Sequence, residues 1–410
     1  MVGNYIDVLE CEQETNRKNS RVTGMLCCFT CILFLCLFLF FESCFFMCLL
    51  IGMMCIWISS ENLTTKVFSV LVMFLLMLLV LYRYISFDFI PQALDLLNVD
   101  TSLMYWIQKG HIHAVRLAIA YPAYIMHCMF SIELNRAFSY YCVIVFMLLF
   151  MQICSVKEIL TKKRGSLCST FFILFFTVFL SFIMNGRICF AFLGYSILIK
   201  QMNLLFADSK PSMWVKRYAE IIIGTVLTTV SSGTMLVAIL FLVVMFAFRI
   251  VKFKRIEAGA CRLFLVAIFC SKLIIVGVKY VLKMIDKNIT YFGGGIQGII
   301  NMLQHGVGKI LGAPSNTMLI FLVCIGIVLV GVNLKVVKEV FYKANNTQFT
   351  AFIAFNIAFY GMFVGFSTGS LMLVPLIILF AGALDNKFNV LRKMMLEGGL
   401  DRIYGKKKHI

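Results

Sequence analysis

The sequence predicts an all-α polytopic membrane protein, and three observations lead to this fold class. First, 61% of the 410 residues are hydrophobic and only 14% are charged, whereas soluble domains carry about 45–50% apolar and about 25% charged residues. Second, the apolar residues form long uninterrupted runs, which is typical of helical spans and not of alternating barrel strands. Third, the chain contains only five prolines, and proline is the residue that interrupts helices. We expect a single transmembrane domain over residues 1–410.

A span needs about 20 apolar residues, with a range of about 17–25, and the apolar runs of this chain define about twelve predicted spans. The run at 23–59 is divided at Glu42-Ser43, and the run at 218–250 is divided near Ser231-Ser232-Gly233 because basic residues flank both of its ends. The predicted spans are residues 24–41, 44–58, 67–82, 139–155, 168–184, 188–206, two within 218–250, 261–284, 316–334, 350–366 and 369–384.

Residues 114–132 are apolar as well, but they contain Arg116, Pro122 and His127. These residues indicate an interfacial or re-entrant helix and not a full span. If this segment did cross the bilayer, the N-terminal half would invert, and the first long run would form one span. A short amphipathic helix is also expected after Gly293-Gly294-Gly295, which we interpret as a flexible hinge.

The net charge of +18 lies mainly in short loops and in the tail. The positive-inside rule and anionic lipid headgroups account for this charge, so no nucleic-acid partner is expected. If the basic loops lie inside the cell, the outer face holds segment 83–138, the Asn185-Gly186-Arg187 turn and loop 285–315. Residues 1–23 and the basic tail 385–410 are then cytoplasmic, and the acidic N-terminus does not resemble a signal peptide. The 16 cysteines are interpreted as small apolar residues.

Arg187 stands at the lip of two predicted spans, where an arginine is costly if it faces lipid. Its guanidinium suits phosphate oxygens, so one interpretation is a site for a lipid-linked phosphate. The other is an interfacial arginine that snorkels and orients a helix. Lys279 lies on one helix face with Lys272, and either a hydrated interior position or snorkelling explains it. His111 and His113 have no carboxylate at a ligand offset, so neither a metal nor another cofactor is expected.

The stretch Met184-Asn185-Gly186-Arg187-Ile188-Cys189-Phe190-Ala191-Phe192-Leu193-Gly194 resembles the Wzy-type O-antigen and capsule polymerases of bacteria. A looser resemblance covers Ser86-Phe87-Asp88-Phe89, where related polymerases often carry an Asp-Tyr motif and this chain has Phe89 in place of the tyrosine. The number of spans and the large outer loops late in the chain also agree with this family.

The resemblance implies an inverting, metal-independent glycosyl transfer at the periplasmic face of the bacterial inner membrane. The fold would resemble the lipid-dependent C-type glycosyltransferases. Donor and acceptor would both be oligosaccharides linked to undecaprenyl diphosphate, with membrane lipid and a chain-length regulator protein as further partners.

Because Arg187 stands in the motif that resembles the family, the resemblance implies that it binds the diphosphate. From the predicted outer-face location and the side-chain charge alone, we expect Arg116, Arg83 and Lys279 to bind the diphosphate too. We expect His305 or Asp88 to be the catalytic base.

Three other functions remain open. About twelve spans and a positive charge also suit a flippase or transporter of lipid-linked oligosaccharide, although the two halves look unlike each other and the polar residues gather in outer loops. An O-antigen ligase would likewise use an outer histidine and arginines. A non-enzymatic scaffold is disfavoured by Lys272 and Lys279 within an apolar run.

Overall fold

The structure is a computed structural model in which every regular element of the described residues is a helix. It describes residues 24, 42–87, 99–109, 113–161, 166–184, 186–206, 214–252, 271–311, 317, 320, 322–331, 347–363 and 369–385. The chain divides into two compact units. The first comprises Met1–Cys189 and Phe380–Ile410, and the second comprises Phe190–Leu379.

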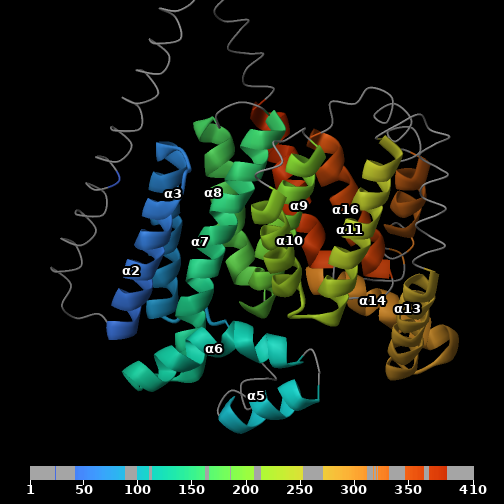
Figure 1. Ribbon diagram of the computed structural model, residues 1–410, viewed down its shortest axis with the longest axis horizontal. Helices are drawn as coiled ribbons and strands as arrows, with labels where there is room; N and C mark the ends of the chain where they lie inside the picture. The colour runs from blue at the N-terminus through green and yellow to red at the C-terminus, as the bar shows by residue number, and fades with distance from the viewer. Residues whose placement is uncertain are drawn as a thin grey trace, which may run out of the picture. The chain divides into compact units, whose positions relative to one another are not determined.

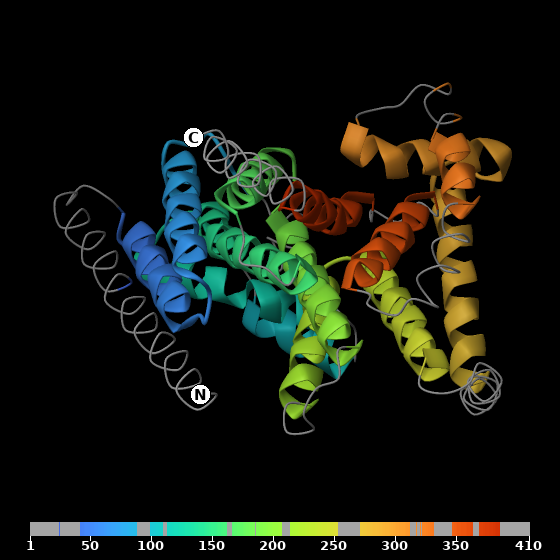
Figure 2. The same ribbon diagram turned by 90° about the horizontal axis from the view of Figure 1, so that it is seen from above.

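The first unit is built around one long central helix. Its helices are α2 (Ser43–Ile58), α3 (Leu63–Leu81), α5 (Val99–Gln108), α6 (His113–Phe130), α7 (Leu134–Thr161), α8 (Leu167–Ile183) and the start of α9 (Gly186–Phe206). Helix α7 packs against α2, α3, α6 and α8, and most of its side chains are buried. In both views α2 and α3 run side by side at one edge of this unit (Figures 1 and 2).

The helices of the first unit run alternately up and down, so its chain turns gather at two opposite ends. One end, here called the α6 end, holds Glu42, residues 82–87, α6, the start of α7 and the start of α9. The other, here called the Asp385 end, holds residues 59–62, the end of α7, Ser166 and Asp385. Segments that are distant in sequence therefore share one end.

Helix α6 lies across the α6 end, while α2, α3 and α7 stand roughly parallel to one another (Figure 1). It packs against α7 and α2, and the Cys48 thiol approaches the Met126 sulfur at 3.5 Å. Pro122 lies inside the helix. Helix α6 is not among the described helices that are long and apolar enough to cross a membrane.

Helix α8 turns its polar side inward and its apolar side outward. Its buried residues include Ser169, Thr170, Thr177 and Ser181, and the Thr177 hydroxyl donates to the Ile173 carbonyl at 2.8 Å. Most of its exposed residues are phenylalanines, namely Phe171, Phe175, Phe179 and Phe182. Small hydroxyl residues allow close packing between helices in lipid, where an exposed phenylalanine row is favourable. This pattern fits a helix that faces acyl chains.

Within the described residues, three helices are long and apolar enough to span a membrane: Leu63–Leu81, Leu134–Thr161 and Gly186–Leu205. Shorter apolar helices are Ser43–Ile58, Leu167–Ile183, Ser232–Phe248, Leu322–Gly331, Phe349–Met362 and Ser370–Asp385. These helices agree with an all-α membrane protein. The count of twelve spans stays a prediction, and predicted span 24–41 lies almost wholly outside the described residues.

The second unit holds the rest of α9, α10 (Trp214–Thr228), α11 (Ser232–Lys252), α13 (Ser271–Tyr291), α14 (Gly295–Leu311) and α16 (Thr347–Phe363). A 3-10 turn, η2 (Gly369–Met372), precedes the last helix. Helices α9 and α10 touch at Gly194 and Gly224, and the Tyr195 hydroxyl donates to the Ala354 carbonyl at 2.7 Å. Arg217 donates to the Leu204 carbonyl near the end of α9 at 2.7 Å, so this arginine of α10 caps the end of α9.

Helices α13 and α14 form a hairpin whose turn is the predicted glycine hinge. Gly293, Gly294 and Gly295 all have positive φ, at 112°, 72° and 55°, which glycine adopts without steric cost. The Gly294 amide donates to the Ile289 carbonyl at 2.9 Å. The three glycines therefore form a defined, hydrogen-bonded turn between two helices.

Two charged residues at the Asp385 end lie in helices, where the prediction had a loop and a tail. Residues 156–167 were expected to form a loop, but α7 continues to Thr161 and buries Lys157. Asp385 was expected to begin the tail, but it is the buried last residue of the Ser370–Asp385 helix. The two charges neutralise each other as an ion pair. Hydropathy scores each residue separately and does not include this pairing, so it predicted that both lie in solvent. Residues 386–410 lie outside the described part of the chain.

Candidate functional site

A cavity of about 200 Å³ opens at the α6 end of the first unit. Its lining comes from the end of α3, the following turn, the residue before α7 and the first two turns of α7. The lining residues are Val80, Arg83, Ile85, Ser86, Glu133, Asn135, Arg136 and Ser139. Small-molecule sites commonly measure about 300–1,000 Å³. This pocket therefore suits a compact anionic group and not an entire oligosaccharide.

The pocket combines two guanidinium groups with one carboxylate. Arg83 and Glu133 are exposed on its rim, while Arg136 is more enclosed, with its side chain 22% exposed. Guanidinium groups remain charged and offer several N–H donors in a fixed plane, which matches the oxygens of a phosphate or diphosphate. A carboxylate beside them can accept a proton.

Arg83 is held in an unusual backbone conformation. Its φ is +61°, in the left-handed region that costs a non-glycine residue roughly 1–2 kcal/mol. Backbone hydrogen bonds fix the turn around it, from the Arg83 amide to Val80 at 3.1 Å and from the Tyr84 amide to Leu79 at 2.9 Å. Such conformations cluster at binding sites, where the surrounding structure maintains them. No residue pattern around Arg83 predicts this conformation.

Arg136 is positioned by a carboxylate on another helix end. Its Nε lies 2.8 Å from a Glu42 carboxylate oxygen, and the Tyr140 hydroxyl donates to the same oxygen at 3.0 Å. Glu42 precedes α2, so this network joins α2 to the first two turns of α7. Arg136 thus combines an ion pair to Glu42 with a place in the pocket lining.

The turn after α3 meets the start of α9 through Phe87. The Phe87 amide donates to the Ser139 hydroxyl at 2.9 Å, and Ser139 also lines the pocket. A Cβ added to Gly186 would lie only 2.5 Å from Phe87 Cβ and 3.1 Å from Cys142 Sγ. Gly186 is therefore required for space. The two stretches that carried the resemblance, around Ser86-Phe87 and Gly186-Arg187, are in direct contact.

The predicted site residues fall into three groups. Arg83 lines the pocket, whereas Arg187, half-buried at the start of α9, is not among the lining residues. Arg116 is half-buried on α6 and does not line the pocket. Lys279 is exposed on α13, and His305 belongs to α14, both in the second unit. Asp88 lies outside the described residues. Among those residues, no three His, Cys, Asp or Glu side chains gather as metal ligands would.

Three features of the first unit were not identified as important from the sequence. Glu133 was one carboxylate among several on the predicted outer face, and Glu42 was only a break between two spans. Lys157 and Asp385 were counted as loop and tail charges, yet their side chains are 1% and 2% exposed and 3.0 Å apart. In each case the sequence shows a charged residue beside an apolar run. The residue that pairs with this charge depends on the fold and cannot be read from the sequence.

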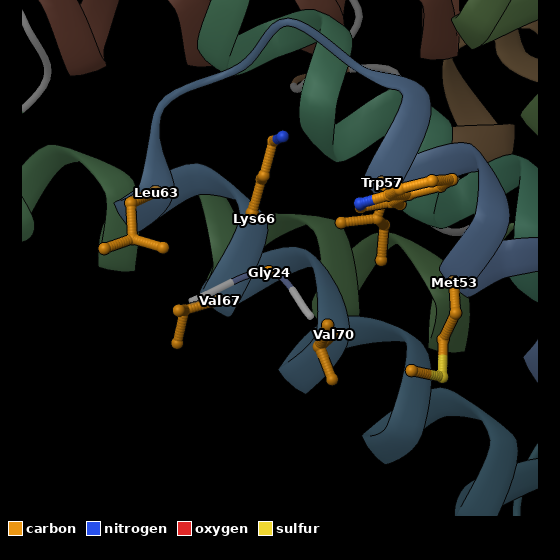
Figure 3. Close-up of a pocket in the computed structure, with 8 residues that line it drawn as sticks. Gly24, Met53, Trp57, Leu63, Lys66, Val67 and Val70 are labelled. Carbon is orange, nitrogen blue, oxygen red and sulfur yellow. The ribbon is translucent and has the colours of Figure 1, made fainter. Parts of the chain in front are cut away.

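A second pocket lies between α2 and α3 at the Asp385 end (Figure 3). Its volume is only about 20 Å³, which is about enough for one water molecule. Met53, Trp57 and Val70 are among its apolar lining residues, and Figure 3 shows the Lys66 ammonium directed away from them. We assign no chemistry to this pocket.

Comparison of the chain with protein-family models, with curated protein sequences and with solved structures finds no match.

Proposed function

We propose that this chain is a bacterial inner-membrane glycosyltransferase that joins lipid-linked oligosaccharide units into O-antigen or capsule polysaccharide. The observation that carries the proposal is the pocket at the α6 end, in which Arg83, Arg136 and Glu133 converge. Phe87, whose amide donates to the pocket residue Ser139, contacts Gly186, so the Gly-Arg motif begins near the pocket. The α6 end would face the periplasm.

In the proposed reaction, the arginines bind the diphosphate of the donor, which is the leaving group. The acceptor hydroxyl oxygen attacks the anomeric carbon of the donor sugar, and the bond from that carbon to the diphosphate oxygen breaks. The hydroxyl proton passes to the Glu133 carboxylate, and undecaprenyl diphosphate departs with the bonding electrons. Negative charge grows on the leaving group, so Arg83 and Arg136 bind the transition state more tightly than the substrate.

A transporter or flippase of the same lipid-linked units is the second candidate, and one observation favours it. Lys157 and Asp385 form a buried ion pair within an apolar helix bundle. Ionisable groups in such positions mark ion or proton pathways in many transporters. An O-antigen ligase has no separate structural observation in its favour.

Surface polysaccharide length in a strain that lacks the gene tests the proposal. We expect wild type to restore a ladder of repeat numbers. Arg83→Gln, at equal protein level, should leave mainly single repeat units on lipid A. Loss of one charge-stabilising donor typically lowers a rate by about 10²–10³-fold. Lys66→Gln is the matched control, because Lys66 lies at the opposite, Asp385 end of the same unit, and it should keep the ladder.

The deletion strain distinguishes the candidate functions. Single repeat units on lipid A in that strain indicate loss of a polymerase. Absence of any surface repeat unit indicates a role in export or ligation and contradicts the proposal. An unchanged ladder in the deletion strain excludes all three functions.

A further inference from the structure

Helix α13 carries a row of exposed lysines along one face. Lys272, Lys279, Lys283 and Lys287 are all exposed. At 100° per residue they lie within an arc of about 80°, and they extend about 22 Å along the axis. Asp286 is the one acidic residue of α13. Asp286 balances only one of the four lysine charges within this helix, so the row has a net positive charge.

An exposed apolar row runs beside the lysines. Ile275, Val278 and Leu282 are 53%, 52% and 59% exposed, and they occupy an arc of about 60° next to the lysine row. Among the described elements, α14 is the substantial packing partner of α13. Neighbouring basic and apolar rows on one helix are the pattern of helices that lie in a membrane–water interface.

The hairpin holds α13 at the edge of the second unit. Leu303 of α14 packs against the buried pair Phe359 and Met362, so α14 anchors the hairpin to α16. The glycine turn changes the direction of the chain between α13 and α14, and Figure 2 shows α14 crossing the end of α13. A Cβ on Gly298 would lie 2.4 Å from the Ile289 carbonyl oxygen. This close approach fixes the geometry of the hairpin.

We propose that this face of α13 docks on the anionic headgroups of the membrane surface. Ile275, Val278 and Leu282 enter the acyl boundary, and the lysine row meets the phosphates of anionic phospholipids. A helix that crossed the bilayer would instead carry the row through hydrocarbon, where each lysine is costly. Residues 261–284 were expected to span the membrane. Docking on the surface replaces that expectation for the described part, Ser271–Tyr291.

Fluorescence quenching in the full-length protein tests the docking surface. Leu282→Trp is reconstituted into phosphatidylcholine vesicles with or without phosphatidylglycerol and without undecaprenyl lipids. The parent protein is measured in parallel, because it has three tryptophans of its own. Lipids brominated near the headgroup should quench the added emission at least about twofold more when the anionic lipid is present. Lipids brominated near the bilayer centre should have little effect.

Charge variants in the Leu282→Trp background separate docking from misfolding. Replacing the four lysines with glutamine should abolish the dependence on anionic lipid, whereas replacing them with arginine should keep it. Asp286→Lys should increase it. Equal quenching in both lipid compositions, dominant quenching from the bilayer centre, or no quenching at all would each overturn the proposal. The last result would leave an acidic protein as the partner of this face.

Discussion

Replacing Lys157 with alanine should lower the free energy of unfolding by about 3–5 kcal/mol, because it leaves the Asp385 carboxylate charged and buried without its partner. The Lys157 ammonium lies 3.0 Å from Asp385 and donates to the Ser169 hydroxyl at 2.9 Å. Asp385 also accepts from the amide and hydroxyl of Ser166, the N-cap residue of α8. The pair thus joins the end of α7, the start of α8 and the last described helix. Denaturant titration of the purified protein in detergent measures the effect.

The controls for Lys157 separate a broken pair from a lost side chain. Lys216→Ala removes an exposed lysine and should change the stability by no more than about 0.5 kcal/mol. The double variant Lys157→Met with Asp385→Leu should recover most of the loss, since apolar groups of similar size can replace a buried ion pair. If Lys157→Ala proved as mild as Lys216→Ala, the buried pair would not hold this end together.

Replacing Gly194 with valine should destabilise the protein by about 3 kcal/mol or more, because two helix backbones meet there. A Cβ on Gly194 would lie 2.5 Å from the Gly224 carbonyl oxygen and 2.9 Å from Leu227 Cβ. Backbone atoms cannot move aside as a side-chain tip can, so α9 and α10 must separate. Gly194→Ala should cost less than valine, roughly 1–3 kcal/mol. Thermal unfolding in detergent ranks the two variants.

Gly331 provides the matched control, since it is also a glycine in an apolar helix. Among the described residues, a Cβ there would meet nothing within 4 Å, so Gly331→Ala should be neutral or stabilising by up to about 1 kcal/mol. Equal effects of alanine at Gly194 and Gly331 would show that the α9–α10 contact is looser than the structure has it.

Hydropathy located most helices because apolar runs of this length have one stable form in lipid. Helix α2 (Ser43–Ile58) matches predicted span 44–58, and α8 (Leu167–Ile183) matches 168–184, each within one residue. The break near Ser231 between α10 and α11 is confirmed. Charged residues near span ends were placed less well. Lys157 continues a helix because Asp385 neutralises it, and that partner is 228 residues away in sequence.

The candidate site was only partly accessible from the sequence. Arg83 and Arg187 were singled out by charge and motif, and the structure links their neighbourhoods through Phe87 and Gly186. The contribution of Glu133 and the support of Arg136 by Glu42 depend on contacts between helix ends. Spacing along the chain carries no information about those contacts, because α6 intervenes between α3 and α7 and lies across them. Gly186 of the Gly-Arg pair is required by its packing against Phe87, in addition to its place in the motif.

One reaction in purified components tests whether the pocket of Arg83, Arg136 and Glu133 binds a diphosphate leaving group. Protein in vesicles receives a single-repeat undecaprenyl diphosphate oligosaccharide, and product length and released undecaprenyl diphosphate are measured together. Arg83→Gly is the informative variant, because glycine removes the cation and relieves the left-handed backbone at φ +61°. The gain of roughly 1–2 kcal/mol is largely offset by the chain entropy of glycine, about 0.5–1 kcal/mol, so the fold should remain intact. We predict that wild type elongates the oligosaccharide with release of the lipid diphosphate, and that Arg83→Gly slows both about 10²–10³-fold at unchanged stability. Elongation by Arg83→Gly at the wild-type rate would contradict the role of Arg83 in diphosphate binding, and no elongation by the wild type would contradict the proposed polymerase function.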